Sequence, residues 1–206
     1  WDKGKMFSFQ LGSRIENTGI TGYSFGNPTK RDSSFKRDYT NFFPTIFINY
    51  KFDTLDKHVL SLNVGRRIDR PDYQDMNPFL SPLDRFTLYS GNPFLQPTFS
   101  YNVELTHTYK SNFSTTFTFS YINNVINETI EQKNGIFNSR PGNIGKQIIF
   151  SLYTGGSIPV KTWWKIQIES EVSYNKNKAV IYNQQLNNNG AFFGFAATNQ
   201  FQVNKQ

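Results

Sequence analysis

Hydrophobic and polar residues alternate at every second position in several segments of the chain. In residues 99–110 every second residue is apolar apart from His107, and the residues between them are Ser, Asn, Glu, Thr or Lys. The pattern recurs in residues 164–176. Successive side chains of a β-strand point to opposite faces, whereas a helix would spread both sets around its circumference. The alternation therefore predicts strands with one apolar and one polar face.

Six further segments complete the set of predicted strands. Three of them show the same period of two: residues 7–16, 60–65 and 113–121. Three weaker ones have mixed or apolar residues on both faces: residues 41–52, 147–153 and 192–203. Pro44 lies inside the first of the weaker segments. Together these segments predict an all-β fold of about eight strands.

Short and long links alternate along the predicted strands. The short links are residues 54–57, 111–112 and 161–162, and the long ones are residues 18–38, 71–97, 132–146 and 177–190. In an up-and-down sheet, alternate links lie at the same end, so one end carries tight turns and the other carries loops. Outer-membrane barrels have this asymmetry. The prediction is an antiparallel up-and-down meander that forms part of a transmembrane outer-membrane β-barrel, with residues 1–206 as one segment of that domain.

Composition agrees with strands and excludes several other classes. Phe, Tyr and Trp make up 17% of the residues, although the hydrophobic total is only 37%. No apolar run approaches the roughly 18 residues of a membrane-spanning helix, whereas a barrel strand needs only about 9–11. The chain contains no Cys, which excludes disulfides and thiolate metal sites. The net charge of +7 is scattered, without a basic helix or a nucleic-acid motif, so no nucleic-acid partner is expected.

Aromatic residues are frequent near the predicted strand ends. Tyr109, Trp163 and Trp164 lie beside short links, and Tyr39, Phe42 and Phe99 lie near long links. Amphipathic rings settle at the level of lipid headgroups, so these six residues are candidates for two membrane girdles. The alternative is that they fill the core of a soluble β-sandwich, a surface-exposed binding or adhesion module.

The link after the third strand contains the most distinctive sequence. It begins with RRIDRPDYQDMNPF at residues 66–79 and continues to SGNPFLQP at residues 90–97. These motifs resemble the barrel signature of TonB-dependent receptors of the Bacteroidota type. Residues 35–52 and 160–175 are similar to neighbouring barrel strands of the same family. The motif in residues 66–79 is specific, whereas the strands alone are not.

The resemblance implies a function in uptake across the outer membrane. It implies a barrel of about 22 strands with a plugged lumen that takes up a scarce solute such as a siderophore or glycan. The implied partners are outer-membrane lipid, lipopolysaccharide, the solute and the TonB complex, the last through parts of the protein not in this chain. Neither a plug domain nor a TonB box is recognised in the sequence, so we expect a fragment of the barrel wall.

The link around the motif also contains candidate ligand-binding residues. Arg66, Arg67 and Arg70 could hold an anionic solute at the barrel mouth through charge-assisted hydrogen bonds, or pair with loop carboxylates or lipopolysaccharide phosphates. Four aromatic residues could stack on a sugar or siderophore ring, or fix the loop to itself. They are Tyr73, Phe79, Phe86 and Tyr89.

Metal binding and catalysis find weaker support. Asp69, Asp72 and Asp75 share the link and are weak candidates for an oxygen-rich cation site. His58 lies beside a short turn and His107 on an apolar face, and neither has a Ser or Asp at a recognisable nucleophile spacing. No cofactor and no catalytic residue is predicted. A barrel-borne envelope hydrolase, the remaining alternative, would need a histidine and an acid near the loops.

Overall fold

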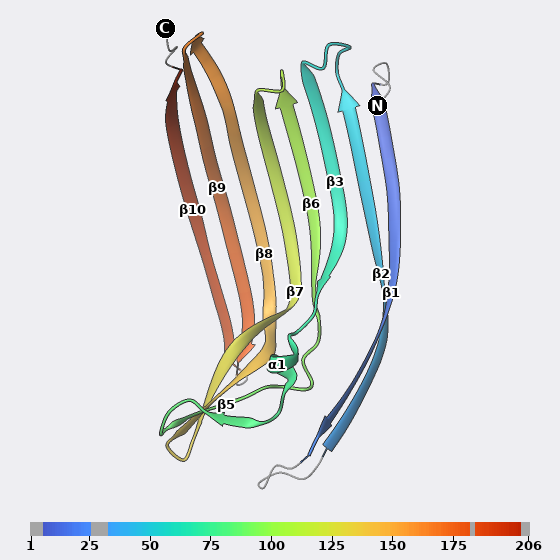
Figure 1. Ribbon diagram of the computed structural model, residues 1–206, viewed down its shortest axis with the longest axis vertical. Coiled ribbons are helices and arrows are strands. Elements are labelled where there is room, and N and C mark those ends of the chain that lie inside the picture. The colour runs from blue at the N-terminus through green and yellow to red at the C-terminus, as the bar shows by residue number, and fades with distance from the viewer. Residues whose placement is uncertain (1–5, 26–32, 182–183, 203–206) are drawn as a thin grey trace.

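The computed structural model describes residues 6–25, 33–181 and 184–202. These residues form one sheet of ten strands and one short helix (Figure 1). The eight long strands are β1 (Phe7–Ser24), β2 (Ser33–Lys51), β3 (His58–Asp69), β6 (Thr98–Tyr109), β7 (Phe113–Lys133), β8 (Ile136–Lys161), β9 (Trp164–Ile181) and β10 (Gln184–Phe201). The three short elements are α1 (Tyr73–Met76), β4 (Leu80–Pro82) and β5 (Thr87–Ser90).

The long strands confirm the predicted antiparallel meander. Each pairs with the next long strand along the chain, from β1 through β3 and then β6 through β10. The two short strands lie within the link between β3 and β6, where β5 pairs in parallel with β8 and β4 pairs with β5. In the described part of the chain, no helix is long and apolar enough to cross a membrane.

Strand register separates the residues of the sheet into two faces. One row of directly paired positions crosses all eight long strands with an apolar residue on each: Phe9, Ile48, Leu62, Leu105, Phe117, Leu152, Val172 and Phe193. The adjacent row on the opposite face is mainly polar: Gln10, Phe47, Asn63, Glu104, Thr118, Ser151, Ser173 and Phe192. The sheet therefore has one apolar face and one largely polar face.

Nothing in the described residues covers the apolar face. Phe9 is 66% exposed, Val172 48% and Phe193 68%. Among the described hydrophobic residues only Phe43, Met76 and Leu95 are buried, and none of them belongs to the apolar row. A β-sandwich buries its apolar faces against each other. The sandwich alternative is therefore wrong for this arrangement, since the apolar rings and aliphatic chains point out of the sheet.

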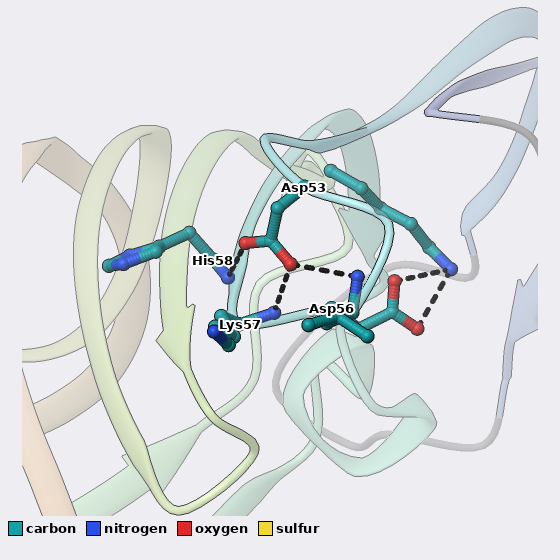
Figure 2. A network of polar contacts seen from close by, with 6 residues as sticks. Asp53, Asp56, Lys57 and His58 are labelled. Atoms are coloured by element: carbon teal, nitrogen blue, oxygen red, sulfur yellow. Dashed lines mark hydrogen bonds and ion pairs between the residues drawn. The ribbon is translucent and has the colours of Figure 1, made fainter.

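The short links are tight turns at one end of the sheet, which lies at the top of Figure 1. In the turn between β2 and β3, one carboxylate organises the backbone (Figure 2). Asp53 Oδ1 accepts hydrogen bonds from the N–H groups of Leu55 and Lys57, both 2.9 Å, and Oδ2 accepts one from His58 at 3.1 Å. The N–H of Lys57, followed by those of Leu55 and His58, lowers the pKa of the Asp53 carboxyl.

The predicted long links differ from the structure at three of four places. β1 and β2 continue as paired strands to Ser24 and from Ser33, so most of residues 18–38 is strand, and residues 26–32 lie outside the described residues. Residues 177–190 are likewise mostly paired strand, up to Ile181 and again from Gln184, and residues 182–183 lie outside the described residues. Polar residues on both faces conceal the period of two, yet they pair their backbones as well as apolar residues do.

The link at residues 132–146 is a two-residue turn within a long hairpin. Asn134 and Gly135 both have positive φ, 53° and 80°. Asn-Gly adopts the type I′ turn that matches strand twist, so it joins β7 and β8 directly. Nearer the sheet, Asn124 has φ 57° and the β7–β8 register shifts there, which is a β-bulge. Beyond the bulge the hairpin bends away from the sheet (Figure 1).

We predict that Asp53→Asn destabilises the protein more than Asp56→Asn does. Asp53 accepts three backbone hydrogen bonds, whereas Asp56 makes one exposed ion pair with Lys51. Because the folded pKa of Asp53 is lowered, its stabilisation is complete above the pKa of an unfolded aspartate, about 3.9, and is lost as pH falls through the folded value. Urea unfolding in detergent micelles from about pH 7 to about pH 2 measures the difference. Equal losses for the two variants would contradict the assignment.

Candidate functional site

The link between β3 and β6, residues 70–97, is a folded unit that we call the motif loop. Its two Asn-Pro-Phe sequences form matching turns. Asn77 Oδ1 accepts a hydrogen bond from the N–H of Phe79 at 3.2 Å, and Asn92 Oδ1 accepts one from Phe94 at 3.0 Å. Proline fixes φ in the middle of each turn, and the asparagine side chain replaces the backbone acceptor. The sequence thus specifies two turns of the same kind.

The two halves of the motif contact each other directly. The N–H of Gly91 donates to the carbonyl of Asn77 at 2.8 Å, and that of Asn92 donates to the carbonyl of Asp75 at 2.5 Å. A Cβ atom on Gly91 would lie 2.4 Å from the oxygen of Asn77, closer than atoms can approach. The glycine of SGNPF is therefore required by the contact with DMNPF.

The motif loop is fixed to the wall on both sides. Arg37 of β2 donates from Nη1 to the carbonyl of Leu95 and from Nη2 to that of Phe94 at 2.7 Å. On the other side, Asn143 of β8 exchanges hydrogen bonds of 2.7 and 2.8 Å with the backbone of Gln96. Leu95 between these anchors is 1% exposed. The loop therefore bridges β2 and the bent end of the β7–β8 hairpin.

We predict that Gly91→Ala disorders the motif loop, whereas Gly190→Ala in β10 is tolerated. A Cβ at Gly91 meets backbone atoms of Asn77 and Asp75, which cannot move without breaking the loop, and one at Gly190 meets nothing within 4 Å. Limited proteolysis of the folded protein in micelles should cut the motif loop faster in the first variant only. Resistance equal to that of the parent in Gly91→Ala would contradict the close contact.

Arg66 fills the place where β2 and β3 separate. The β2–β3 ladder ends at the pair Thr45–Gly65, next to Pro44, which has no N–H, while the β1–β2 ladder continues through Pro44. Arg66 Nη1 donates to the freed carbonyl of Phe42 at 2.9 Å. Its guanidinium also lies over the ring of Phe99, 4.4 Å from the centroid.

The same guanidinium reaches the polar face of the sheet through the gap between β2 and β3. Its Cζ lies 5.6 Å from the centroid of Phe43, and Arg14 lies over the same ring at 5.1 Å. Phe43 belongs to the polar face and Phe99 to the apolar face, so Arg66 passes between the strands. We call the place where β2 and β3 separate, which Arg66 fills between the rings of Phe43 and Phe99, the seam. Arg66 and Arg67 were predicted to lie in a loop, but both belong to β3, since the strand continues to Asp69.

A groove of about 720 Å³ opens on the polar face beside the seam. Arg14, Arg66 and Arg67 contribute positive charge to its lining and Glu104 contributes negative charge. Asn63 and Asn102 also line it. Arg70, the third predicted arginine, instead forms an ion pair of 2.6 Å with Glu16 and a hydrogen bond of 3.2 Å with Thr18. Of the three predicted arginines, the structure thus places Arg66 and Arg67 at the groove.

The other candidates of the motif loop lie apart from the groove lining. Tyr73 is 85% exposed, and Phe79 and Phe86 are also exposed. Tyr89 donates a hydrogen bond to Asp75 at 3.1 Å, and partial burial of the hydroxyl raises the pKa of Tyr89. Asp69 and Asp72 are exposed. Within the described residues, no three His, Cys, Asp or Glu side chains come together as a metal site would require, so these aspartates are not assembled into one.

A contact that the sequence analysis missed lies at the short-turn end of the sheet. His58 Nδ1 and His107 Nε2 are 3.1 Å apart. In the sequence 48 residues lie between the two histidines, and the pairing of β3 with β6 brings them together. The register of these strands was the only signal that could have revealed the contact.

Comparison with protein families decides the class of the chain. Residues 2–206 match the model of the outer membrane protein beta-barrel family. The chain belongs to this family. It is therefore a protein of the outer membrane. A search of curated proteins finds no match.

Solved structures give the same fold at low sequence identity. The siderophore receptor PirA from Pseudomonas aeruginosa aligns with 96% of this chain and 43% of its own, at 12% identity and a TM-score of 0.55. The copper transporter OprC aligns with 99% and 39%, at 11% identity and 0.61. The hemophore receptor HasR of Serratia marcescens aligns with 97% and 44%, at 11% identity and 0.51. The chain spans less than half the length of these proteins. The predicted receptor-type barrel fold is confirmed, and the Bacteroidota type stays a prediction.

The predicted girdle residues of this barrel segment lie on two different faces. Tyr109 and Trp164 lie on the apolar face at the short-turn end, and Trp163 stacks on Trp164 with ring centroids 6.3 Å apart. Phe42 and Phe99 share that face near the loop end. Tyr39 lies on the polar face, because it is three positions from Phe42 and neighbouring faces alternate at every residue. The placement of Tyr39 in a girdle was therefore wrong.

Proposed function

We propose that this chain forms part of the wall of a TonB-dependent receptor that takes up a scarce solute across the outer membrane. The observation that supports this most is the pair of adjacent rows on opposite faces, one apolar on all eight long strands and one mainly polar. A barrel that carries a solute needs this division, with lipid on one side and water on the other. Siderophores, copper and heme appear in the names of proteins with the same fold.

The groove beside the seam is the proposed contact of the wall with the solute. Three arginines line it, and because Arg66 is engaged with the carbonyl of Phe42, Arg14 and Arg67 are the two that can hold carboxylate, phosphate or another anionic group through charge-assisted hydrogen bonds. Arg14 already contacts Glu16 at 2.9 Å and the ring of Phe43, so Arg67 is the more available of the two. Exposed aromatics of the motif loop, Tyr73 and Phe86, are proposed as outer contacts for a ring-bearing solute.

The remaining partners follow from the location of the segment. Lipid and lipopolysaccharide are the proposed partners of the apolar face, whose aromatic residues lie near both ends of the strands. Energy would come from the TonB complex, through parts of the receptor outside these residues. Residues 1–206 are in this proposal a single barrel segment, completed by further strands of the receptor.

Cysteine labelling tests the orientation of the wall. The chain contains no Cys, so each introduced cysteine is the only thiol of this segment. In the receptor in native outer membranes, Glu104→Cys and Ser173→Cys should react with a water-soluble maleimide. Their neighbours Leu105→Cys and Val172→Cys should be protected until detergent or denaturant is added, because lipid covers them. The proposed orientation would be rejected if the cysteines at 104 and 105, or at 172 and 173, reacted equally. It would also be rejected if only those at 105 and 172 reacted.

An uptake experiment tests the solute contact. Cells carrying the receptor would be supplied with a labelled ferric siderophore, heme or an acidic oligosaccharide, with and without TonB. We predict TonB-dependent uptake of one of them, and a loss of about tenfold or more in Arg67→Glu, since one charge-assisted hydrogen bond contributes roughly 1.5–3 kcal/mol.

Lys165→Glu is the matched control for that experiment. Lys165 also lies on the polar face but at the short-turn end of β9, away from the groove. Uptake by this variant should equal that of the parent at equal amounts of receptor in the membrane. Uptake that is independent of TonB for every solute would contradict the proposed function. An equal loss in both variants would contradict the role of the groove alone.

A further inference from the structure

The sequence contains two histidines, and their side chains contact each other across neighbouring strands. His107 lies opposite Leu60 and His58 opposite Tyr109, so the histidines are diagonal neighbours on the apolar face of β3 and β6. Their ring planes differ by 17° and their centroids are 5.4 Å apart. Both side chains are half-buried, and the pair lies next to the turns that end β2 and β6.

The distance between the facing nitrogen atoms suits two ligands of one metal ion. His58 Nδ1 and His107 Nε2 are 3.1 Å apart. Two imidazole nitrogens bound to one ion at about 2.05 Å lie about 3.3 Å apart at a tetrahedral angle and about 2.9 Å apart at a right angle. The observed separation falls between these values.

We propose that His58 and His107 form a two-histidine site for a divalent ion of the late first transition row, namely Cu²⁺, Ni²⁺ or Zn²⁺. Neutral imidazole is a preferred ligand of these ions, whereas Mg²⁺ and Ca²⁺ require oxygen ligands. Water at the level of the lipid headgroups completes the coordination, because the pair lies at the short-turn end of the sheet beside Tyr109, a predicted girdle residue. The site is separate from the groove and does not depend on the proposed solute.

Binding requires one proton to change position. In the metal-free pair one facing nitrogen carries the hydrogen of the His–His bond and the other accepts it. When the ion binds, both facing nitrogens donate lone pairs, so the donor ring moves its proton to its other nitrogen. No bond to carbon changes and no electron is transferred. The ion replaces the hydrogen bond as the link between β3 and β6.

Charged and aromatic groups around the pair limit its affinity. Lys110 lies over the ring of Tyr109, and its N–H donates to the carbonyl of Lys57, so two cations lie on neighbouring turn residues. Asp53 supplies one negative charge beside the backbone of His58. The Tyr109 ring packs on His58 at 4.8 Å. We therefore expect weaker binding than at closed sites with four protein ligands, and an affinity order with Cu²⁺ above Ni²⁺ and Zn²⁺.

The experiment uses the receptor that contains this chain, purified in detergent micelles. Zn²⁺ and Cu²⁺ are titrated by calorimetry into the parent and into His58→Asn, His107→Asn and Tyr109→Phe. We expect either histidine variant to weaken one binding event by at least about tenfold, because a single imidazole ligand remains. Tyr109→Phe keeps the neighbouring ring and should bind as the parent does.

A second measurement resolves the site without relying on variants. Diethylpyrocarbonate modifies accessible imidazoles, and peptide mass spectrometry identifies each modified histidine. In the parent, Zn²⁺ should slow the modification of His58 and His107 together, at a concentration matching the calorimetric affinity, and Mg²⁺ should not. Unchanged modification of both histidines, or unchanged affinity in both histidine variants, would overturn the proposal, and solute uptake can persist in either case.

Discussion

The constraint on which the whole structure depends is that the backbone N–H and C=O groups must find partners inside hydrocarbon, where no water is available. Long antiparallel ladders meet it between neighbouring strands from β1 to β10, and within the described residues β1 and β10 each have a partner on one side only. Side chains are then free to divide by face, and the hydrophobic residues do not collect in a core. The three hydrophobic residues buried in the described part of the chain lie at the seam and in the motif loop, which are the places where the ladders stop.

The seam shows how the protein meets the same constraint where a ladder fails. Pro44 has no N–H to donate, and β2 and β3 separate next to it, which leaves the carbonyl of Phe42 without a strand partner. Arg66 supplies the missing donor, and Phe43 and Phe99 cover its charge from the two faces. An arginine in such a place binds the wall together more than it binds a solute. The groove forms beside it because the strands have already parted.

Periodicity predicted the parts of the fold in which one face of the sheet is apolar and the other is largely polar. Segments such as residues 99–110 and 164–176 alternate because one face must be apolar, and their strands and tight turns are confirmed. The outer part of β8, residues 136–146, lacks this regular alternation and was predicted to belong to the long link 132–146, although it is paired strand. The signal that remained there was local, namely Asn134-Gly135 and its type I′ turn. Contacts that depend on register, such as His58 with His107 or the motif loop with Asn143, left no trace in the sequence pattern.

The most recognisable residues of the chain are explained mainly by the fold. Gly91 permits a backbone contact, Asn77 and Asn92 hold turns, Arg66 closes the seam and Arg70 pairs with β1. These demands come from joining a long link to the wall, so they are the same whatever passes through the barrel. A motif that specifies such a link identifies the type of barrel but carries little information on the solute. The positions that the folding of the loop leaves free include Arg67 and the polar residues that share the groove with it.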